Sequence, residues 1–354
     1  MPLDHYRTLG RSGLRVSPLC MGAMGWGSTE RGSDEDESFR IMDRFVEMGG
    51  NFLDTSNAYV EGESERVVGR YLAGRPGRRD RLVIATKFSS NLFHGDPNGG
   101  GGGRKALRNQ IEGSLTRLGV DYIDLYWQHH FDRHTPIEET MDALNDFVRQ
   151  GKILYIGISD TPAWTISQAA TTADFRGWAP VTAMQLEYSL LARTVEGELL
   201  PLAESRGIGI TPFSPLAGGV LTGKYTRENP NPAGSARGGT SAGFLAQPNA
   251  FDIIDTLRRI ADERGTSVAA VALGWVLSKP VVTSPLIGPR TMAQFEDNLP
   301  GVDVVLTEKE VAELDDLSAP TLNFPAAFLQ AIAIDRQQAG TTINGIPSKL
   351  YIPK

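Results

Sequence analysis

Short apolar runs alternate with longer segments of helical periodicity along almost the whole chain, and this alternation constrains the fold more than any other feature. Eight runs of strand length are each followed by a helical segment. They occupy residues 17–22, 51–55, 82–87, 122–128, 153–159, 181–187, 208–214 and 281–288. Because strands that alternate with helices pair in parallel, the pattern predicts one parallel sheet. Eight such units predict an α/β fold of the closed (β/α)8 TIM-barrel type.

The length of 354 residues suits one such barrel. We expect a single domain over residues 1–354, with a core of about 5–318 and a C-terminal tail of 319–354. Alternating residues around Ser12-Gly13 predict a two-residue turn, and so a small N-terminal β-hairpin that caps the barrel bottom. Helices are predicted at 34–49, 63–74, 105–119, 137–151 and 250–265. The first of these opens with Asp34 and Glu37, a pattern like a capping box.

Three segments do not fit the repeat. Residues 91–105 include five consecutive glycines, residues 222–249 are rich in Gly, Pro, Ser and Asn, and the tail follows the last helix. Such segments are either flexible surface linkers or lids. Loops that follow barrel strands lie at the C-terminal face, where barrel sites are built, so the first two are the better candidates for lids.

Composition excludes several classes of function. A net charge of -7 disfavours a general nucleic-acid binder. The single cysteine, Cys20, permits no internal disulfide and is expected to be a small core residue. The N-terminus lacks the apolar core of a signal peptide, and no run of about 18 apolar residues predicts a membrane span. A cytoplasmic protein, without nucleic-acid or membrane partners, is therefore expected.

Three motif-like stretches do not support the chemistry that they suggest. Residues 218–225, GGVLTGKY, resemble a phosphate loop, but Tyr225 replaces the hydroxyl residue that holds magnesium. Residues 22–27 lack the glycine spacing of a dinucleotide-binding Rossmann turn. His129 and His130 diverge if they lie on a strand, and no third ligand follows at a recognisable spacing, so we predict no metal site.

Polar residues at the ends of successive strands point to catalysis. Asp54 ends the second strand, Tyr59 lies in the loop behind it, Lys87 ends the third strand, and His129 ends the fourth. The C-terminal ends of barrel strands meet at one rim, so these side chains are expected to converge. Each one alone also suits a structural role, as a cap, a packed loop residue, a solvated strand end or a buried polar group.

Together the four residues suit acid–base chemistry at an oxygen atom. A tyrosine has a pKa near ~10, and a neighbouring ammonium is expected to lower it. Asp54 would keep Lys87 charged and in place, and neutral His129 would bind the substrate oxygen. Tyr59 would then protonate an oxygen on which negative charge develops, as in reduction of a carbonyl by hydride. The reverse oxidation would use tyrosinate as the base.

The sequence resembles the aldo-keto reductases. The resemblance rests on successive motifs over about residues 5–330, in order FLDTSNAY, IATKF, DLYWQHHFD, GISD, MQLEYSLL, FSPLAGGVLTGKY and LIGPRTMAQFEDNL. It implies a barrel that binds NADPH or NADP⁺ across the C-terminal rim without a Rossmann fold. It also implies the catalytic tetrad Asp54, Tyr59, Lys87 and His129, with Tyr59 as the general acid.

The resemblance also implies a set of cofactor contacts. Ser159, Asp160 and Gln185 would hold the nicotinamide carboxamide, Phe213 would stack on the ring, and Gly22, Ala23 and Met24 would lie beside it, near Asp54. Ser214, Leu216 to Gly218, and Lys224 would lie along the phosphates, and Gly288, Arg290, Gln294 and Asn298 would hold the adenosine end. Arg290 is the expected partner of a 2′-phosphate, because a guanidinium binds phosphate in bidentate fashion.

Two positions depart from the common pattern of the family. Asp160 stands where most members carry Asn, although Asp is usual in the branch of aryl-alcohol dehydrogenases and norsolorinic acid reductase-like proteins that the chain most resembles. Gly288 and Gln294 stand where some members have Lys and Arg. A preference for NADPH therefore depends mainly on Arg290.

The predicted substrate is a small carbonyl compound or alcohol, bound to a monomer or a homo-oligomer. Aromatic walls suited to aryl or alicyclic carbonyls are predicted from Trp26, Trp127, His130 and Phe131, each of which also suits core packing. Two alternatives remain open: a Schiff-base aldolase that acts through Lys87, and a cofactor-binding regulatory subunit like the potassium-channel β subunits.

The strand that ends in the histidine doublet has a predicted orientation. If His129 faces the barrel interior, alternation places Ile123, Leu125 and Trp127 on the same face. His130 would then follow the end of the strand and be free to turn toward the substrate. We therefore expect His129 to be catalytic and His130 at most to affect specificity.

Overall fold

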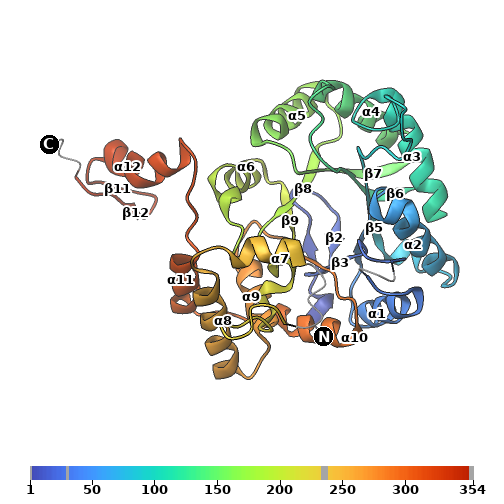
Figure 1. The fold of residues 1–354 in the computed structure, drawn as a ribbon. Helices are drawn as coiled ribbons and strands as arrows, with labels where there is room; N and C mark the ends of the chain where they lie inside the picture. The colour runs from blue at the N-terminus through green and yellow to red at the C-terminus, as the bar shows by residue number, and fades with distance from the viewer. Residues whose placement is uncertain (1, 29–31, 233–237, 351–354) are drawn as a thin grey trace.

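Eight parallel strands form the centre of the computed structural model, which describes residues 2–28, 32–232 and 238–350 (Figure 1). The strand order is β10-β3-β4-β5-β6-β7-β8-β9. Their bounds are β3 Cys20–Gly22, β4 Phe52–Asp54, β5 Val83–Phe88, β6 Ile123–Gln128, β7 Ile153–Ser159, β8 Val181–Glu187, β9 Gly209–Phe213 and β10 Leu286–Ile287. Every strand lies within, or within one residue of, a predicted run, so the sequence pattern identified all eight.

Backbone hydrogen bonds between β9 and the segment before β10 close the barrel. The Ile210 N–H donates to the carbonyl oxygen of Val281, and its own carbonyl accepts from the N–H of Thr283. The last strand is shorter than predicted, because the regular pairing of β10 with β3 begins only after Pro285, which has no N–H to donate. The prediction of a (β/α)8 barrel is confirmed.

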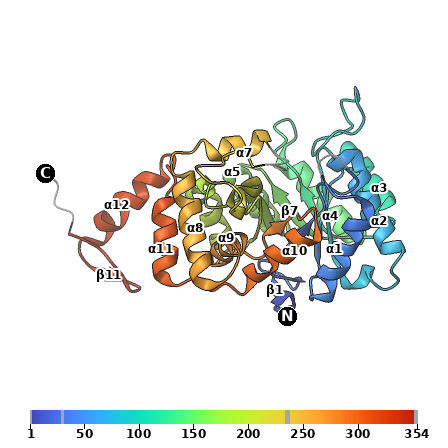
Figure 2. The same ribbon diagram turned by 60° about the horizontal axis from the view of Figure 1, so that its bottom comes forward.

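Helices surround the barrel in the ring visible in Figures 1 and 2. They are α1 Glu35–Glu47, α2 Glu63–Ala73, α3 Arg104–Leu118, α4 Ile137–Arg149, α5 Ala163–Arg176, α6 Leu199–Arg206, α7 Gly238–Leu245, α8 Ala250–Arg264, α9 Val268–Leu277, α10 Met292–Asn298 and α11 Glu308–Leu317. Three of them, α7 to α9, lie between β9 and β10, where strict alternation predicts one. None of the described helices is both long enough and apolar enough to cross a lipid bilayer.

Two details at the N-terminus differ from the sequence predictions. The hairpin of β1 (Arg7–Thr8) and β2 (Arg15–Val16) pairs Thr8 with Arg15, so its loop spans residues 10–13 and the predicted two-residue turn is wrong. In this wider loop the Arg11 N–H donates to the carbonyl oxygen of Gly207, which follows α6. At α1, Asp34 accepts from the Glu37 N–H, but the Glu37 carboxylate accepts from the N–H of Met292 instead of completing a capping box.

The barrel interior is a small apolar core that the hairpin closes from below. It contains Leu9, Val16, Cys20, Phe52, Val83, Ala85, Leu125, Trp127 and Ala183. Cys20 is buried there, as expected for a core residue. Leu125 and Trp127 belong to this core, as alternation predicts, whereas Ile123 packs with the larger cluster of buried residues.

Gly157 on β7 lies against the buried Trp127 ring of β6, and this contact allows a test of core packing. A Cβ atom added at Gly157 would lie 2.1 Å from a Trp127 ring carbon. Because the ring is fully buried and cannot move aside, Gly157→Ala is expected to destabilise the fold by about 1–3 kcal/mol. Chemical denaturation should show this as a lower midpoint. Gly13→Ala, where the new Cβ meets nothing within 4 Å, is the control, and equal midpoints for the two variants would contradict the prediction.

The run of five glycines is packed closely against its surroundings. A Cβ at Gly100 would lie 2.7 Å from Asn91, at Gly101 2.6 Å from Asp132, and at Gly102 2.6 Å from Thr140. Gly101 also donates its N–H to Ser89, and Gly102 accepts from the Thr140 hydroxyl. The glycines thus permit close backbone approach, which argues against a loose linker at this point. A closing movement over a substrate stays a prediction.

The other two segments outside the repeat, residues 222–249 and the C-terminal tail, both contain helical structure. Residues 222–249 contain α7, which the composition of this stretch did not suggest, while residues 233–237 lie outside the described residues. The tail carries α12 (Ala326–Gln338) and a hairpin of β11 (Thr342–Ile343) and β12 (Ile346–Pro347). Figure 1 shows this tail standing outside the ring of helices, beyond α11.

Candidate active site

A cavity of about 520 Å³ lies at the C-terminal ends of the strands, where the barrel geometry predicts a site. Its walls include three of the four predicted catalytic residues, Asp54, Tyr59 and His129. Most predicted cofactor contacts also line it, namely Gly22, Met24, Ser159, Asp160, Gln185, Phe213, Ser214, Leu216, Gly218, Lys224, Gly288, Arg290, Gln294 and Asn298. Ala23 does not line the cavity and is fully buried. The fold therefore brings together residues that are far apart in the sequence.

Lys87 lies just behind this cavity wall and is fully buried. Its ammonium group pairs with Asp54, donates to the Thr55 carbonyl oxygen at 3.0 Å, and donates to the Tyr59 hydroxyl oxygen at 3.1 Å. Gln185 donates its side-chain N–H to the second oxygen of Asp54 at 3.1 Å. An ammonium has three protons to donate, so each proton of Lys87 has an acceptor.

Electrostatics keep Lys87 charged despite its burial. Loss of water acts to lower the pKa of this amine, but the attraction of Asp54 and Tyr59 outweighs the burial and raises the pKa above its usual value. A permanently charged lysine is a poor nucleophile, because attack on a carbonyl requires the free amine. This geometry argues against the Schiff-base alternative.

The Tyr59 hydroxyl behaves differently from the expectation that Lys87 would lower its pKa. Lys87 does act in that direction, but burial is the larger effect and raises the pKa of Tyr59 above its usual value. The expected net lowering is therefore wrong for the structure without a ligand. Tyr59 is protonated at neutral pH, and because Lys87 donates to its oxygen, the phenolic proton is free to be donated elsewhere.

His129 is neutral, as is expected of a residue that binds the substrate oxygen through a hydrogen bond. Burial, followed by repulsion from Lys87 and His130, lowers the pKa of His129 to about 3. Its Nδ1 lies 3.1 Å from the Ser56 hydroxyl, and its ring meets the Tyr59 ring edge to face at 5.7 Å between centroids. Neutral imidazole can therefore present its other nitrogen to the cavity beside the Tyr59 hydroxyl.

The four predicted aromatic walls do not line the described cavity. Trp26 is buried in the larger core between the sheet and the helices, and Trp127 is buried in the barrel interior. The exposed His130 ring stacks on His129 at 5.8 Å, and Phe131 meets Trp164 edge to face at 5.9 Å, so these two lie near the site without forming its walls. Their roles toward a substrate stay predictions.

Several cavity residues were missed by the sequence analysis. They are Pro215, Gly219, Thr222, Leu286, Ile287, Pro289 and Asp297. All of them lie inside or directly beside the motifs that predicted the other contacts, so the motifs contained the signal. Position within a motif does not show which side chains face the cavity, and that depends on the loop conformation.

The cavity suits an extended anionic molecule. Lys224 and Arg290 both line it, and neither has an ion-pair partner in the described part of the chain. Ser214, Ala217 and Gly218 have positive φ angles, which turn the backbone sharply along the wall between the strand ends and Lys224. Two cations that form no ion pair with a described residue, beside a turned, glycine-rich loop, match the chemistry of a dinucleotide phosphate chain.

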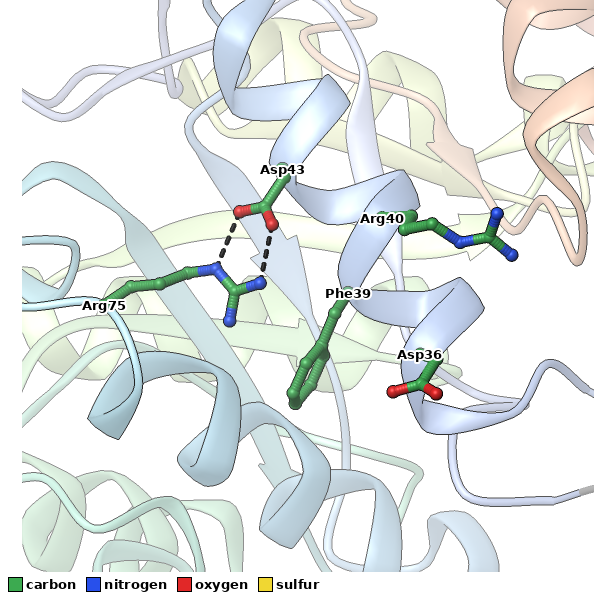
Figure 3. Close-up of a pocket in the computed structure, with 5 residues that line it drawn as sticks. All are labelled: Asp36, Phe39, Arg40, Asp43 and Arg75. Atoms are coloured by element: carbon green, nitrogen blue, oxygen red, sulfur yellow. Dashed lines mark hydrogen bonds and ion pairs between the residues drawn. The ribbon is translucent and has the colours of Figure 1, made fainter.

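A second hollow lies on the outside of the barrel, between α1 and Arg75, which comes two residues after the end of α2 (Figure 3). Arg75 forms a two-point ion pair with Asp43, at 2.7 and 2.6 Å, and lies over the Phe39 ring at 5.0 Å. Because these charges are paired with each other and no predicted site residue lines the hollow, it is not part of the candidate site.

Comparison with known proteins agrees with the barrel fold. The sequence profile of the Aldo/keto reductase family matches residues 18–319. The chain is 39% identical to an uncharacterized oxidoreductase, YrpG, of Bacillus subtilis, over 88% of this chain and 95% of the relative. It is 34% identical to norsolorinic acid reductase B of Dothistroma septosporum, over 99% and 90% of the two chains. It is 33% identical to an aryl-alcohol dehydrogenase of Pestalotiopsis microspora, over 92% and 85%.

These matches cover the barrel and nearly the full length of the relatives, and they agree with the resemblance inferred from the motifs. The chain belongs to the aldo/keto reductase family.

Proposed function

We propose that this protein is an NADP(H)-dependent oxidoreductase that interconverts an aldehyde or ketone with its alcohol. One observation carries the proposal: the buried, charged Lys87 donates a hydrogen bond to the hydroxyl of Tyr59, which faces a cavity at the barrel rim. Such an arrangement stabilises negative charge on the tyrosine oxygen at the moment when its proton leaves. It is the environment that a general acid for a carbonyl oxygen requires.

In the direction of reduction, Tyr59 acts as the acid. A nicotinamide cofactor, held by the cavity residues Ser159 and Gln185, would supply the hydride for the carbonyl carbon. Tyr59 gives its proton to the carbonyl oxygen, and Lys87, held by Asp54, stabilises the tyrosinate that remains. His129 orients the oxygen by donating from the nitrogen opposite Ser56, provided that the Ser56 hydroxyl donates to Nδ1. In the oxidation, tyrosinate accepts the proton of the alcohol.

Cofactor binding would use the remaining walls of the cavity. Gln185, which donates to Asp54, and Ser159, its register partner on β7, would hold the nicotinamide end. Lys224 and the turned loop after β9 would bind the phosphates, and Arg290 would bind a 2′-phosphate. The names of the relatives, norsolorinic acid reductase and aryl-alcohol dehydrogenase, support an aryl carbonyl or alcohol as substrate.

Turnover of small carbonyl compounds tests the proposal directly. Purified protein is mixed with NADPH and a panel of aromatic and alicyclic aldehydes and ketones, or with NADP⁺ and the matching alcohols, and absorbance of the reduced cofactor is followed. We expect turnover with aryl substrates in at least one direction. Cofactor binding without turnover across the whole panel would favour the regulatory alternative, and a covalent adduct trapped by borohydride would favour the aldolase.

Arg290→Met is expected to weaken NADPH binding selectively. Loss of a charge-assisted contact to phosphate costs about 1.5–3 kcal/mol, so Kd for NADPH should rise about 10- to 100-fold while Kd for NADH changes little. Fluorescence titration measures both constants. Arg206→Met, which removes a guanidinium paired with Asp174 on α5, is the matched control. An unchanged ratio of the two constants in the Arg290 variant would exclude this assignment.

A further inference from the structure

Asp160 carries a cavity carboxylate that has no partner in the described part of the chain. Asp160 directly follows β7, its side chain is open to the cavity, and it makes no hydrogen bond or ion pair within the described residues. Its φ angle of 40° is unusual for a residue other than glycine. The backbone is held there from both sides, because its N–H donates to the Gln185 carbonyl and its carbonyl accepts from the Phe131 N–H. The fold therefore fixes the backbone that carries this carboxylate at the cavity.

The charges that face Asp160 leave it largely ionised at neutral pH. Partial burial, followed by repulsion from Glu187 at the end of β8, raises the pKa of Asp160 to about 6. Lys87 on β5 acts to lower this pKa. The Tyr59 hydroxyl is the other titratable group that senses its charge. Lys87 is already paired with Asp54, and no cation of the described residues forms an ion pair with Asp160.

This carboxylate lies at the reacting end of the cavity. The same cavity wall holds Tyr59, His129, Ser159 and Gln185. A nicotinamide ring that exchanges hydride with a carbonyl held by Tyr59 and His129 must lie at this end, and so near Asp160. The oxidised ring carries a positive charge and the reduced ring does not, so a fixed negative charge beside it distinguishes the two forms.

We propose that Asp160 makes the protein bind the oxidised cofactor, NADP⁺, in preference to NADPH and so favours oxidation of the alcohol on the enzyme. The inference rests on the proposed function. In that direction Tyr59 first gives its own proton to solvent. The alcohol carbon then gives a hydride to the ring, and the hydroxyl proton of the alcohol passes to the tyrosinate of Tyr59. The C–H and O–H bonds break, the C=O bond forms, and NADP⁺ becomes NADPH. The solution equilibrium is unchanged, and only the balance between bound forms shifts.

Binding of the two cofactor forms, measured without any substrate, tests the inference. Kd values for NADP⁺ and NADPH are determined by titration calorimetry for the wild type and for Asp160→Asn, which has nearly the same shape without the charge. At pH 7.5 we expect the ratio of Kd for NADPH to Kd for NADP⁺ to fall about tenfold in the variant, the effect of one partly screened charge near another. Thermal unfolding checks that the variant is folded.

The pH dependence of the same ratio in the wild type gives a second measurement that needs no variant. Below about pH 6 Asp160 is protonated and the preference for NADP⁺ should vanish, and it should rise as pH increases through this value. The 2′-phosphate titrates in the same range, but it is present in both cofactors and cancels in the ratio. Glu187→Gln should move the transition to lower pH, because it removes a charge that raises the pKa of Asp160.

The outcomes separate the inference from the function on which it rests. A ratio that is independent of pH in the wild type and unchanged in Asp160→Asn would overturn the role of Asp160, while cofactor binding would still support the proposed function. If the wild type binds neither NADP⁺ nor NADPH, the proposed function itself is wrong and the inference falls with it.

Discussion

Tyr59→Phe is expected to lower kcat by about 10²–10⁴-fold, the usual contribution of a positioned general acid, while Kd for NADPH stays within about twofold. Only the hydroxyl is removed, and the aromatic ring that packs edge to face on His129 is retained. Lys87 loses one of its acceptors but keeps Asp54 and the Thr55 carbonyl. The variant should therefore fold and bind cofactor yet be unable to deliver a proton.

Steady-state rates and cofactor titration on the same preparation check both parts of this expectation. Tyr6→Phe is the matched control, because the Tyr6 hydroxyl bonds the Gly49 carbonyl near the barrel bottom and does not line the cavity. Wild-type turnover in Tyr59→Phe would show that another group delivers the proton. A loss of cofactor binding equal to the loss of rate would show that Tyr59 acts in binding instead.

Lys87→Met is expected both to abolish turnover and to destabilise the fold. Its methionine side chain fills a similar volume, but Asp54 is left buried without its counter-charge. Breaking a buried ion pair by removing one partner costs about 3–5 kcal/mol. Chemical denaturation should therefore show a large fall in the midpoint, in addition to the loss of kcat that follows when tyrosinate is no longer stabilised.

Two further variants separate the structural effect from the chemical one. Lys152→Met removes one partner of an ion pair with Glu112 that is largely open to water, and it should cost no more than about 1 kcal/mol. Asp54→Asn combined with Lys87→Met removes both buried charges and should recover part of the stability without recovering activity. If Lys87→Met is as stable as Lys152→Met, the buried pair does not contribute as argued.

Much of the fold was predictable because the signals for it are local. Strand and helix periodicity are visible within a few residues, and they identified all eight strands and the long amphipathic helices such as α8. By contrast, α9 was not identified from its pattern. Residues Ala269 to Val276 of α9 are all buried, so the helix has no polar face and no apolar period to detect.

The candidate site was predictable in outline for a geometric reason. Parallel strands in a barrel end at one rim, so residues at strand ends, such as Asp54 and His129, had to lie near one another. The aromatic walls were not predictable in this way. Trp127 belongs to the inner core and does not line the cavity, and alternation does not show which inward-facing side chains reach the cavity.

The sequence by itself determined the order of strands and helices, the closed barrel that follows from eight repeats, and the chemical types gathered at the rim. The tertiary structure decided how those groups behave. It buried Tyr59 enough that its pKa rises although Lys87 is adjacent, and it gave every proton of Lys87 an acceptor. It also placed Lys224 and Arg290 on one cavity, where neither pairs with a carboxylate of the described residues. Periodicity depends on neighbours along the chain, whereas pKa values and cavities depend on burial and on distances between residues that only folding brings together.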